Sequence, residues 1–256
     1  MIKRKRSAAA VVFVSIAMIC GIYFMALSFK RTKYENHIFR IPENLSVLPS
    51  INADDICYLF DPDDKKLMSG YSDYTAVAVV SKIVGTSYEN VKIQFDGTVT
   101  GTPYTNYEVE IIRNIKGKLK SDCSVPLVEF GGISIDGQYL ENIITLLEQG
   151  KCYVLYLTAA ENGALYLNKA YQIPDDALEK NQAGETIRVK EESAIQEYLD
   201  AYSHEDLQYA PANRFVSAYD EGEYNYSNLT KIITVLNLIH KRDIIISGII
   251  IRLPIF

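Results

Sequence analysis

The residues best suited to catalysis or metal binding are few in this sequence and lie far apart. The histidines are His37, His204 and His240, and neither His-Glu-x-x-His nor Cys-x-x-Cys occurs. A zinc site needs histidines or cysteines at close, regular spacing, which this chain lacks. We therefore expect no metal site and no cofactor.

Patterns for a nucleophile or a phosphate loop are also missing. There is no Gly-x-Ser-x-Gly and no Ser-x-x-Lys, and Lys-Ser/Thr does not follow Gly131-Gly132. The acidic run 61–64 is not a calcium loop, because Lys65 and Lys66 follow where oxygen ligands and Gly are needed, so it predicts a turn. The sequence favours a protein that is not an enzyme.

Cysteine chemistry is limited to three residues outside the apolar amino-terminal run, namely Cys57, Cys123 and Cys152. Three cysteines form at most one disulfide, which excludes a disulfide-dense scaffold. Cys123 with Cys152 is the first pairing to test, because both residues lie in strand-like segments.

Tyrosine is the residue type that could form a binding surface. The chain has 19 Tyr and no Trp, and a tyrosine ring combines apolar area with a polar tip. We predict a binding surface near the starts of predicted strands, made by Tyr71, Tyr74, Tyr104 and Tyr107. Strand propensity and core filling are the alternative explanation for these tyrosines.

Five strand-like segments would position these residues. Each is rich in β-branched residues or alternates apolar with polar residues, and they cover 74–84, 104–115, 124–130, 152–158 and 164–168. Gly85-Thr86 predicts the end of the first strand, and Asp96-Gly97 predicts a hairpin turn. Pro126 places the third strand at an edge or a bulge.

Helical spacing predicts two helices around the strands. Apolar residues of 140–150 recur at i, i+3, i+4 and i+7 before Gly150, which predicts a short helix between the third and fourth strands. After a strand at 186–189, an amphipathic helix is predicted over 190–203, packed on the barrel. The fold class is therefore mainly β, a five-stranded OB-type barrel with a short helix and a carboxy-terminal amphipathic helix.

This strand pattern also resembles a known family. The resemblance rests on Tyr74–Val84, on 103–109 leading into Ile115-Lys116-Gly117, on 128–132 and on 150–157. These segments, within about residues 71–172, resemble extracytoplasmic bacterial proteins whose domain is similar to the OB fold of netrins and tissue inhibitors of metalloproteinases. The resemblance implies a barrel with a binding role. It implies no inhibitor mechanism, because the free amino-terminal Cys of that family is missing here.

The amino terminus predicts a transmembrane helix or signal anchor. Residues 8–28 carry no charge, and at 1.5 Å per residue they span a hydrocarbon core of about 30 Å. Four Lys or Arg precede this run and three follow it, so residues 1–7 are expected in the cytoplasm and the carboxy-terminal domain outside the cell. Cleavage near Ser28, with secretion, is the alternative.

Charge separates the anchor from the remainder of the chain. Residues 1–33 hold seven Lys or Arg and no Asp or Glu, which leaves 19 basic against 32 acidic residues in the rest. An acidic body disfavours nucleic acid as a partner.

The expected layout beyond the anchor has four parts. A stalk covers 29–70, an OB-like barrel domain 71–189, a helical extension 190–229 and an Ile-rich tail 230–256. Both apolar runs of the tail are too short to cross a membrane, and Ile244–Ile251 is typical of an aggregation-prone strand. A frameshifted tail is the alternative to a native one.

Together these features predict a single-pass cell-membrane protein. Its extracellular barrel would be a binding or accessory module for an unknown envelope protein or glycan. An envelope hydrolase with an unrecognised site and a structural subunit of a membrane complex remain the alternatives.

Overall fold

The computed structural model divides the chain into two compact units, Met1–Asp220 and Glu221–Phe256, which are described separately. The residues that the structure describes are 2–35, 37–39, 48–51, 59–141, 146–181, 183–222, 244–246 and 249–251.

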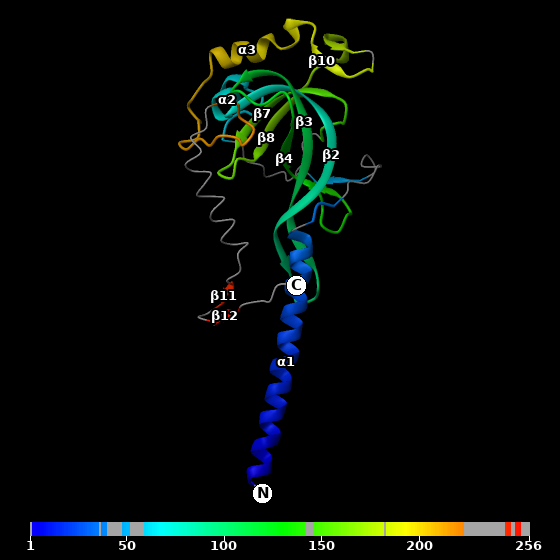
Figure 1. Cartoon of the computed structure of the whole chain (residues 1–256), viewed down its shortest axis with the longest axis vertical. Helices are drawn as coiled ribbons and strands as arrows, with labels where there is room; N and C mark the ends of the chain where they lie inside the picture. The colour runs from blue at the N-terminus through cyan, green and yellow to red at the C-terminus, as the bar shows by residue number, and fades with distance from the viewer. Residues whose placement is uncertain are drawn as a thin grey trace. The chain divides into compact units, whose positions relative to one another are not determined.

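Helix α1, Ile2–Glu35, contains the predicted membrane segment (Figure 1). Its part Val14–Glu35 is long and apolar enough to cross a membrane, and none of its most apolar stretch is buried against other parts of the chain. Ile19 and Phe24, for example, are 66 % and 62 % exposed. So much uncovered apolar surface suits lipid better than water, and the prediction of a membrane-capable helix is confirmed.

Five strands close into a barrel in the order β2-β3-β4-β8-β7 (Figure 1). Their bounds are β2 Tyr74–Ile93, β3 Val99–Lys116, β4 Ser124–Phe130, β7 Cys152–Ala159 and β8 Leu165–Gln172. All neighbours are antiparallel except β4 and β8, which pair in parallel. The first strand of the barrel thus pairs with the second and the fourth, and the third with the fifth. This is an OB-type barrel, and the predicted fold class is confirmed.

The long β2–β3 hairpin differs from the prediction that the first strand ends at Gly85-Thr86. Strand β2 continues to Ile93, and several register shifts along the pair absorb its twist. Gly85 is needed for another reason: a Cβ there would collide with the backbone oxygen of Phe39, which pairs with Thr86 by two hydrogen bonds of 2.8 Å. The predicted Asp96-Gly97 turn is confirmed, because Gln94 N donates to Thr98 O.

The prediction that Pro126 places its strand at an edge or a bulge is wrong, because β4 lies between β3 and β8 in the closed barrel and its pairing with β3 has no register shift. Pairing of β4 with β8 begins only at Leu127, so the missing N–H of Pro126 removes no hydrogen bond from that ladder.

The segment predicted as a short helix over 140–150 is not helical in its described residues. Leu140–Glu141 form strand β6, which lies between β1 (Ser50–Ile51) and β5 (Gly132–Ile133). Gly150 takes a positive φ in a turn before β7. Pairing on both sides, with nearby β5 and with β1 far away in the sequence, makes this segment a strand, and a helical periodicity contains neither partner. Residues 142–145 lie outside the described part of the chain.

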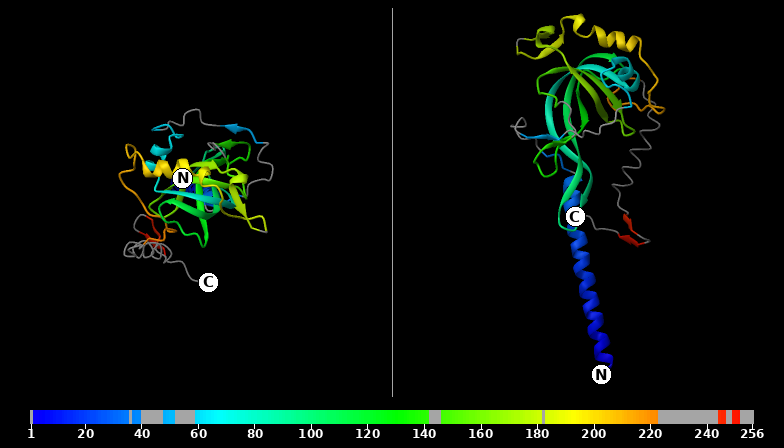
Figure 2. Two further views of the ribbon diagram at one scale, coloured as in Figure 1. Left: turned by 90° about the horizontal axis from the view of Figure 1, so that it is seen from above. Right: turned by 180° about the vertical axis from the view of Figure 1, so that it is seen from behind.

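Short helices cover one end of the barrel (Figures 1 and 2). Helix α2, Lys65–Tyr71, follows the acidic turn predicted at 61–64, and Asp64 caps it by accepting hydrogen bonds from Lys66 N and Leu67 N. The helix predicted over 190–203 is broken at Ile195 into the 3-10 turn η3, Glu192–Ala194, and helix α3, Gln196–Ser203. A further 3-10 turn, η2 (Asp175–Ala177), precedes the antiparallel pair β9 (Leu178–Lys180) and β10 (Thr186–Val189).

Two apolar clusters stabilise this unit. One fills the barrel with inward-facing residues such as Val80, Val109 and Leu155. The other packs the outer face of β2 and β7 against Met68 of α2 and Tyr198 of α3, so the predicted packing of the amphipathic helix on the barrel is confirmed. Burial at both faces explains why β7 is the most continuously apolar strand.

In the second unit, β11 (Ile244–Ile246) and β12 (Ile249–Ile251) form an antiparallel pair. The isoleucine run predicted as one strand is therefore two strands that pair with each other, which covers one edge of each. The other residues of the tail lie outside the described part of the chain.

Candidate functional site

Three aromatic side chains form a surface cluster on the outside of the barrel. They are Tyr104 of β3, Phe130 of β4 and Tyr166 of β8, called here the aromatic cluster. The Tyr104 ring lies 5.7 Å from that of Phe130 and 6.2 Å from that of Tyr166, with edge-to-face geometry in both pairs. Phe130 is 46 % exposed, and the two tyrosines are partly exposed. Because β3, β4 and β8 are neighbours in the barrel, the three rings form one patch.

Strand alternation turns these rings outward. Each aromatic residue has a buried neighbour at the adjacent position of its strand, namely Thr105, Glu129 or Leu165. Because side chains alternate between the two faces of a strand, the aromatic residues face outward. The register then brings them together, since Tyr166 pairs with Val128 across β4 and β8.

Glu89 of β2 lies beside the aromatic cluster and supplies a carboxylate. Partial burial raises the pKa of Tyr104 and of Tyr166, and the negative charge of Glu89 raises both further. Glu89 is itself exposed and pairs with Thr102 in the β2–β3 register. The patch thus offers apolar ring faces, phenol groups that stay protonated, and one hydrogen-bond acceptor with a full charge.

The aromatic cluster lies largely on the second and third strands of the barrel. OB-type barrels bind oligonucleotides and oligosaccharides on the face of their second and third strands. In this chain those strands are β3 and β4, which carry Tyr104 and Phe130.

The four tyrosines predicted as a binding surface do not lie together on the surface. Tyr104 belongs to the aromatic cluster, and Tyr71 is half-buried against the ring of Phe60. Tyr74 and Tyr107 are core residues, 3 % and 1 % exposed, so their assignment to a surface is wrong. Inward pleat phase explains Tyr107, and cover by the segment around Ser217 explains Tyr74, whose hydroxyl accepts a hydrogen bond from Ser217 N.

Sequence reasoning missed Phe130, Tyr166 and Glu89. For Phe130 the signal was present, because it stands in the outward phase of the alternating run 125–130. For Tyr166 and Glu89 the deciding fact is the pairing of distant strands.

Inside the barrel, Tyr107 and Glu129 form a buried pair. The Tyr107 hydroxyl donates a hydrogen bond of 2.7 Å to Glu129 Oε2. Burial raises the pKa of Glu129 to about 7, against a smaller lowering by the tyrosine. A carboxyl with such a pKa is a candidate acid or base in a cleft, but Glu129 is only 9 % exposed and faces the barrel core.

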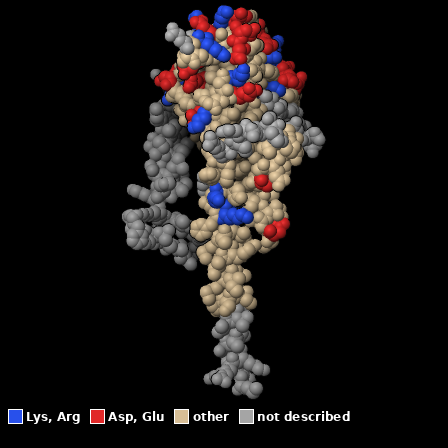
Figure 3. Space-filling model, turned by 90° about the vertical axis from the view of Figure 1, so that its right-hand side faces the viewer, with Lys and Arg blue, Asp and Glu red and all other residues tan. Residues whose placement is uncertain are grey.

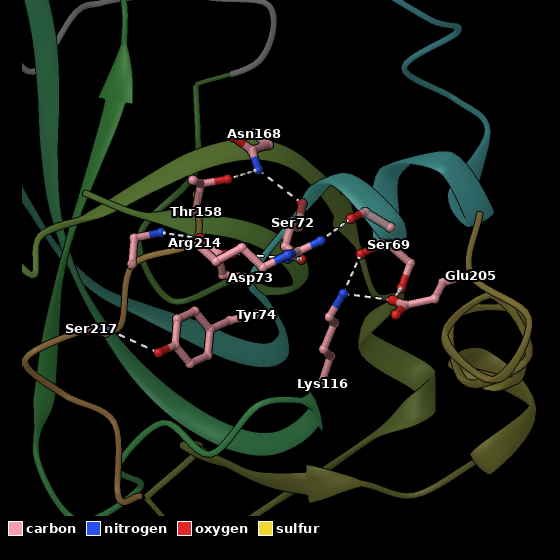
Figure 4. Close-up of polar contacts among 12 residues, drawn as sticks. Ser69, Ser72, Asp73, Tyr74, Lys116, Thr158, Asn168, Glu205, Arg214 and Ser217 are labelled. Carbon is pink, nitrogen blue, oxygen red and sulfur yellow. Dashed lines mark hydrogen bonds and ion pairs between the residues drawn. The ribbon is translucent and has the colours of Figure 1, made fainter. Parts of the chain in front are cut away.

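A polar network closes one end of the barrel, where α2 meets the chain around Glu205 and Arg214 (Figure 4). Arg214 donates to the backbone oxygens of Gly70 and Ser72 and to Asp73 Oδ1. Lys116 donates to Ser69 O at 2.7 Å and to Glu205 Oε2 at 2.6 Å. The donors and acceptors of this network are hydrogen-bonded to one another. We therefore interpret it as a structural contact that holds residues 205–217 on the barrel, called here the clasp, and not as a ligand site.

A second group of tyrosines lies between the barrel and α3. The rings of Tyr156, Tyr171 and Tyr198 contact one another, and Lys65 Nζ lies 5.0 Å from the Tyr171 ring centre and 5.6 Å from that of Tyr198. The chain's own ammonium therefore occupies the ring faces where a ligand cation would bind.

The cysteines do not form the predicted pair. Cys123 and Cys152 are both free. Cys152 is buried in β7, opposite Val79, against the outer apolar cluster, whereas Cys123 is exposed in the connection that leads into β4. Being in strand-like segments does not bring two thiols together, because barrel register and side-chain phase place each one. Cys57 lies outside the described residues.

Among the described residues, no group of three or more His, Cys, Asp or Glu is arranged to hold a metal ion. Exposed His204 has Nδ1 2.9 Å from Ser203 Oγ and 3.0 Å from Asp200 O, which are contacts within the end of α3. His37 packs edge-on against Phe39, and His240 lies outside the described residues.

No family model matches this chain, and no curated protein sequence matches it.

Proposed function

We propose that this protein is a membrane-anchored module that binds a glycan outside the cell through the aromatic cluster. The observation that carries the proposal is the meeting of Tyr104, Phe130 and Tyr166 on the outer face of three neighbouring strands, beside Glu89.

The anchoring part of the proposal is supported by α1. Its apolar side chains are uncovered, and basic residues flank both ends of the apolar run. The larger positive cluster precedes the run, which favours a cytoplasmic amino terminus and a barrel on the other side of the membrane. Retention of α1, rather than cleavage near Ser28, is part of this proposal.

A glycan is favoured over other ligands by the chemistry of the patch. Sugar rings present apolar C–H faces and hydroxyl groups, which suit aromatic faces and a carboxylate acceptor respectively. The same face of OB-type barrels also binds nucleic acid, but an acidic chain repels phosphate. The resemblance to the netrin and tissue-inhibitor domain, which we propose as a relationship of fold, likewise implies binding.

The test is binding of the full chain, in detergent, to an array of immobilised oligosaccharides. Tyr104→Ala and Phe130→Ala should each weaken binding about tenfold, which is the loss of about 1.4 kcal/mol expected for a buried aromatic contact. Tyr202→Ala is the matched control, since Tyr202 is 40 % exposed on α3 and its ring lies beside Lys116, at the opposite end of β3 from Tyr104, so the variant should bind like the unaltered chain.

Two outcomes would contradict the proposal. Equal losses in Tyr104→Ala and Tyr202→Ala would remove the aromatic cluster as the site. Capture of one protein by cross-linking on intact cells, dependent on Tyr104 while every oligosaccharide fails, would make the ligand a protein. Hydrolysis of a bound oligosaccharide would instead support the hydrolase alternative.

The orientation is tested separately by a maleimide reagent that does not cross membranes. On intact cells it should label exposed Cys123, and Cys123→Ser should lose that label. Labelling of Cys123 only after lysis would place the barrel in the cytoplasm.

A further inference from the structure

The tip of the β2–β3 hairpin carries one large apolar side chain among exposed polar residues. Phe95 stands in the turn between Ile93 and Val99 and is 90 % exposed, the largest exposure among the described large hydrophobic residues. A single exposed aromatic ring is ordinary on a protein surface. Whether Phe95 belongs to a binding surface therefore depends on where it lies relative to other exposed apolar residues.

Three contacts fix where this tip lies. The Tyr34 ring of α1 packs edge-on against Tyr88 of β2, with ring centres 6.5 Å apart. Further along, Lys30 Nζ donates to Gly97 O at 3.3 Å, and Tyr23 Oη donates to Phe95 O at 3.3 Å. The hairpin therefore runs beside α1 from Tyr34 toward its amino terminus, as Figures 1 and 2 show.

These contacts place the turn at the end of the predicted membrane segment. The uncharged run ends at Ser28, and Tyr23 lies five residues inside it, about 7.5 Å at 1.5 Å per residue. Lys30 lies just beyond the run, at the level expected for lipid phosphates. The backbone of the turn thus contacts α1 at both sides of the point where the apolar run ends. Gly97 O contacts Lys30, beyond the run, and Phe95 O contacts Tyr23, inside it.

The surface around the turn combines exposed aromatic rings and a lysine, as a membrane interface does, with one carboxylate, the exposed Asp96. Phe24 and Phe29 of α1 are 62 % and 74 % exposed, near Tyr23 and Lys30. On the face shown in Figure 3, charged side chains are most numerous at the top of the barrel, a few blue and red groups lie lower, and the described part of α1 farthest from the barrel carries none. Aromatic rings concentrate where the headgroups meet the acyl chains, with basic residues on the headgroup side.

We propose that the hairpin tip is a second membrane contact, in which the Phe95 side chain enters the headgroup–acyl boundary of the bilayer that holds α1. This inference rests on the membrane anchoring in the proposed function. The binding partner of the hairpin tip is the lipid bilayer, because the lipid that surrounds Tyr23 and Phe24 of α1 extends to the position of Phe95. With α1 and the hairpin both at the membrane, the barrel would be held at a set height instead of swinging on a single helix.

The absence of tryptophan in this chain permits a direct test. Phe95→Trp makes the full chain a single-tryptophan protein, reconstituted into vesicles of phosphatidylcholine and phosphatidylglycerol. The acyl chains carry bromine, a fluorescence quencher, at either a shallow or a deep position. We expect shallow bromine to remove about half of the Trp emission and deep bromine less, as for a ring about 5–10 Å into the boundary.

Two further single-tryptophan variants separate the possible failures. Phe215→Trp lies in the segment clasped to the barrel, is 41 % exposed before substitution, and should keep its emission. Tyr23→Trp reports on α1 and should be quenched. Quenching of Tyr23→Trp without quenching of Phe95→Trp overturns this inference and leaves the anchor intact. Emission unquenched in Tyr23→Trp overturns the anchor, and the proposed function with it.

Discussion

The Tyr107 hydroxyl and Glu129 Oε2 meet at 2.7 Å inside the barrel and form a hydrogen-bonded pair next to a large cluster of buried apolar side chains. The pair joins β3 to β4, two of the three strands that present the aromatic cluster on their outer faces. A titrating carboxyl in this position makes the stability of the barrel depend on pH.

Glu129→Gln should remove that pH dependence. Because burial raises the folded-state pKa of Glu129 from 4.5 to about 7, the folded chain holds a proton that the unfolded chain releases. The stabilisation is complete below pH 4.5, falls as the pH rises, and is lost above about pH 7. Above that pH, the variant should exceed the unaltered chain in free energy of unfolding by about 3 kcal/mol at most.

Denaturant unfolding of the full chain in detergent, followed from pH 4.5 to pH 8, measures this difference. Glu110→Gln is the matched control, since Glu110 is an exposed carboxylate on the same strand pair and should keep the slope of the unaltered chain. If the free energy of unfolding of Glu129→Gln depended on pH as steeply as that of the unaltered chain, Glu129 would not be the source of the pH dependence.

Arg214→Ala should open the clasp at the end of the barrel. The substitution removes the donors to Gly70 O and Ser72 O and leaves Asp73, whose side chain is 6 % exposed, without its cation. We expect a loss of about 2–3 kcal/mol in the free energy of unfolding, and earlier proteolysis within 205–217.

The matched control for the clasp is Arg113→Ala. Arg113 makes a bidentate ion pair with Glu192 at 2.8 Å, but both side chains are exposed, so its loss should cost less than about 1 kcal/mol. Equal costs for Arg113→Ala and Arg214→Ala would show that burial of Asp73 is not the source of the clasp's stability.

Gly117→Ala should destabilise the barrel more than a change of backbone preference explains. Gly117 has φ +79°, and a Cβ there would collide with the ring of Tyr74. Gly137 has φ +76°, and none of the described atoms lies within 4 Å of its Cβ position. We expect Gly137→Ala to cost about 1 kcal/mol and Gly117→Ala about 3 kcal/mol, measured as shifts in the denaturation midpoint.

Cys123 and Cys152 should differ sharply in reactivity. Burial raises the pKa of the Cys152 thiol to about 12, so almost none of it is thiolate near neutral pH, whereas Cys123 is exposed. Peptide mass spectrometry after brief alkylation should find Cys123 modified and Cys152 unmodified until denaturant is added. A Cys123–Cys152 disulfide in the non-reduced digest would contradict the structure.

Much of the fold was predictable because its signals are local. β-Branched and alternating runs predicted the five barrel strands, and their order in the chain predicted an OB-type barrel. The misplaced ends have long-range causes. At Gly85 a strand-stop signal is overridden by pairing of β2 with β3 and by close approach of Phe39. At Leu140 a helical pattern is overridden by pairing with β1 on one side and β5 on the other.

The candidate site divides in the same way. Tyr104 stands in the same phase as Glu108 and Glu110, and Tyr107 in that of Val109, so alternation alone could have assigned one outward and the other inward. Tyr74 could not be assigned in this way, because the cover provided by Ser217 comes from more than 140 residues away.

By itself the sequence determined an uncharged helix long enough to cross a bilayer, an acidic remainder and a five-stranded barrel, because hydropathy and periodicity act between neighbours along the chain. Only the tertiary structure decided which aromatic rings share a surface, that Glu129 is buried beside Tyr107, and that Phe95 lies level with Tyr23. Those facts depend on strand register and on contacts between distant segments, and a one-dimensional pattern does not carry them.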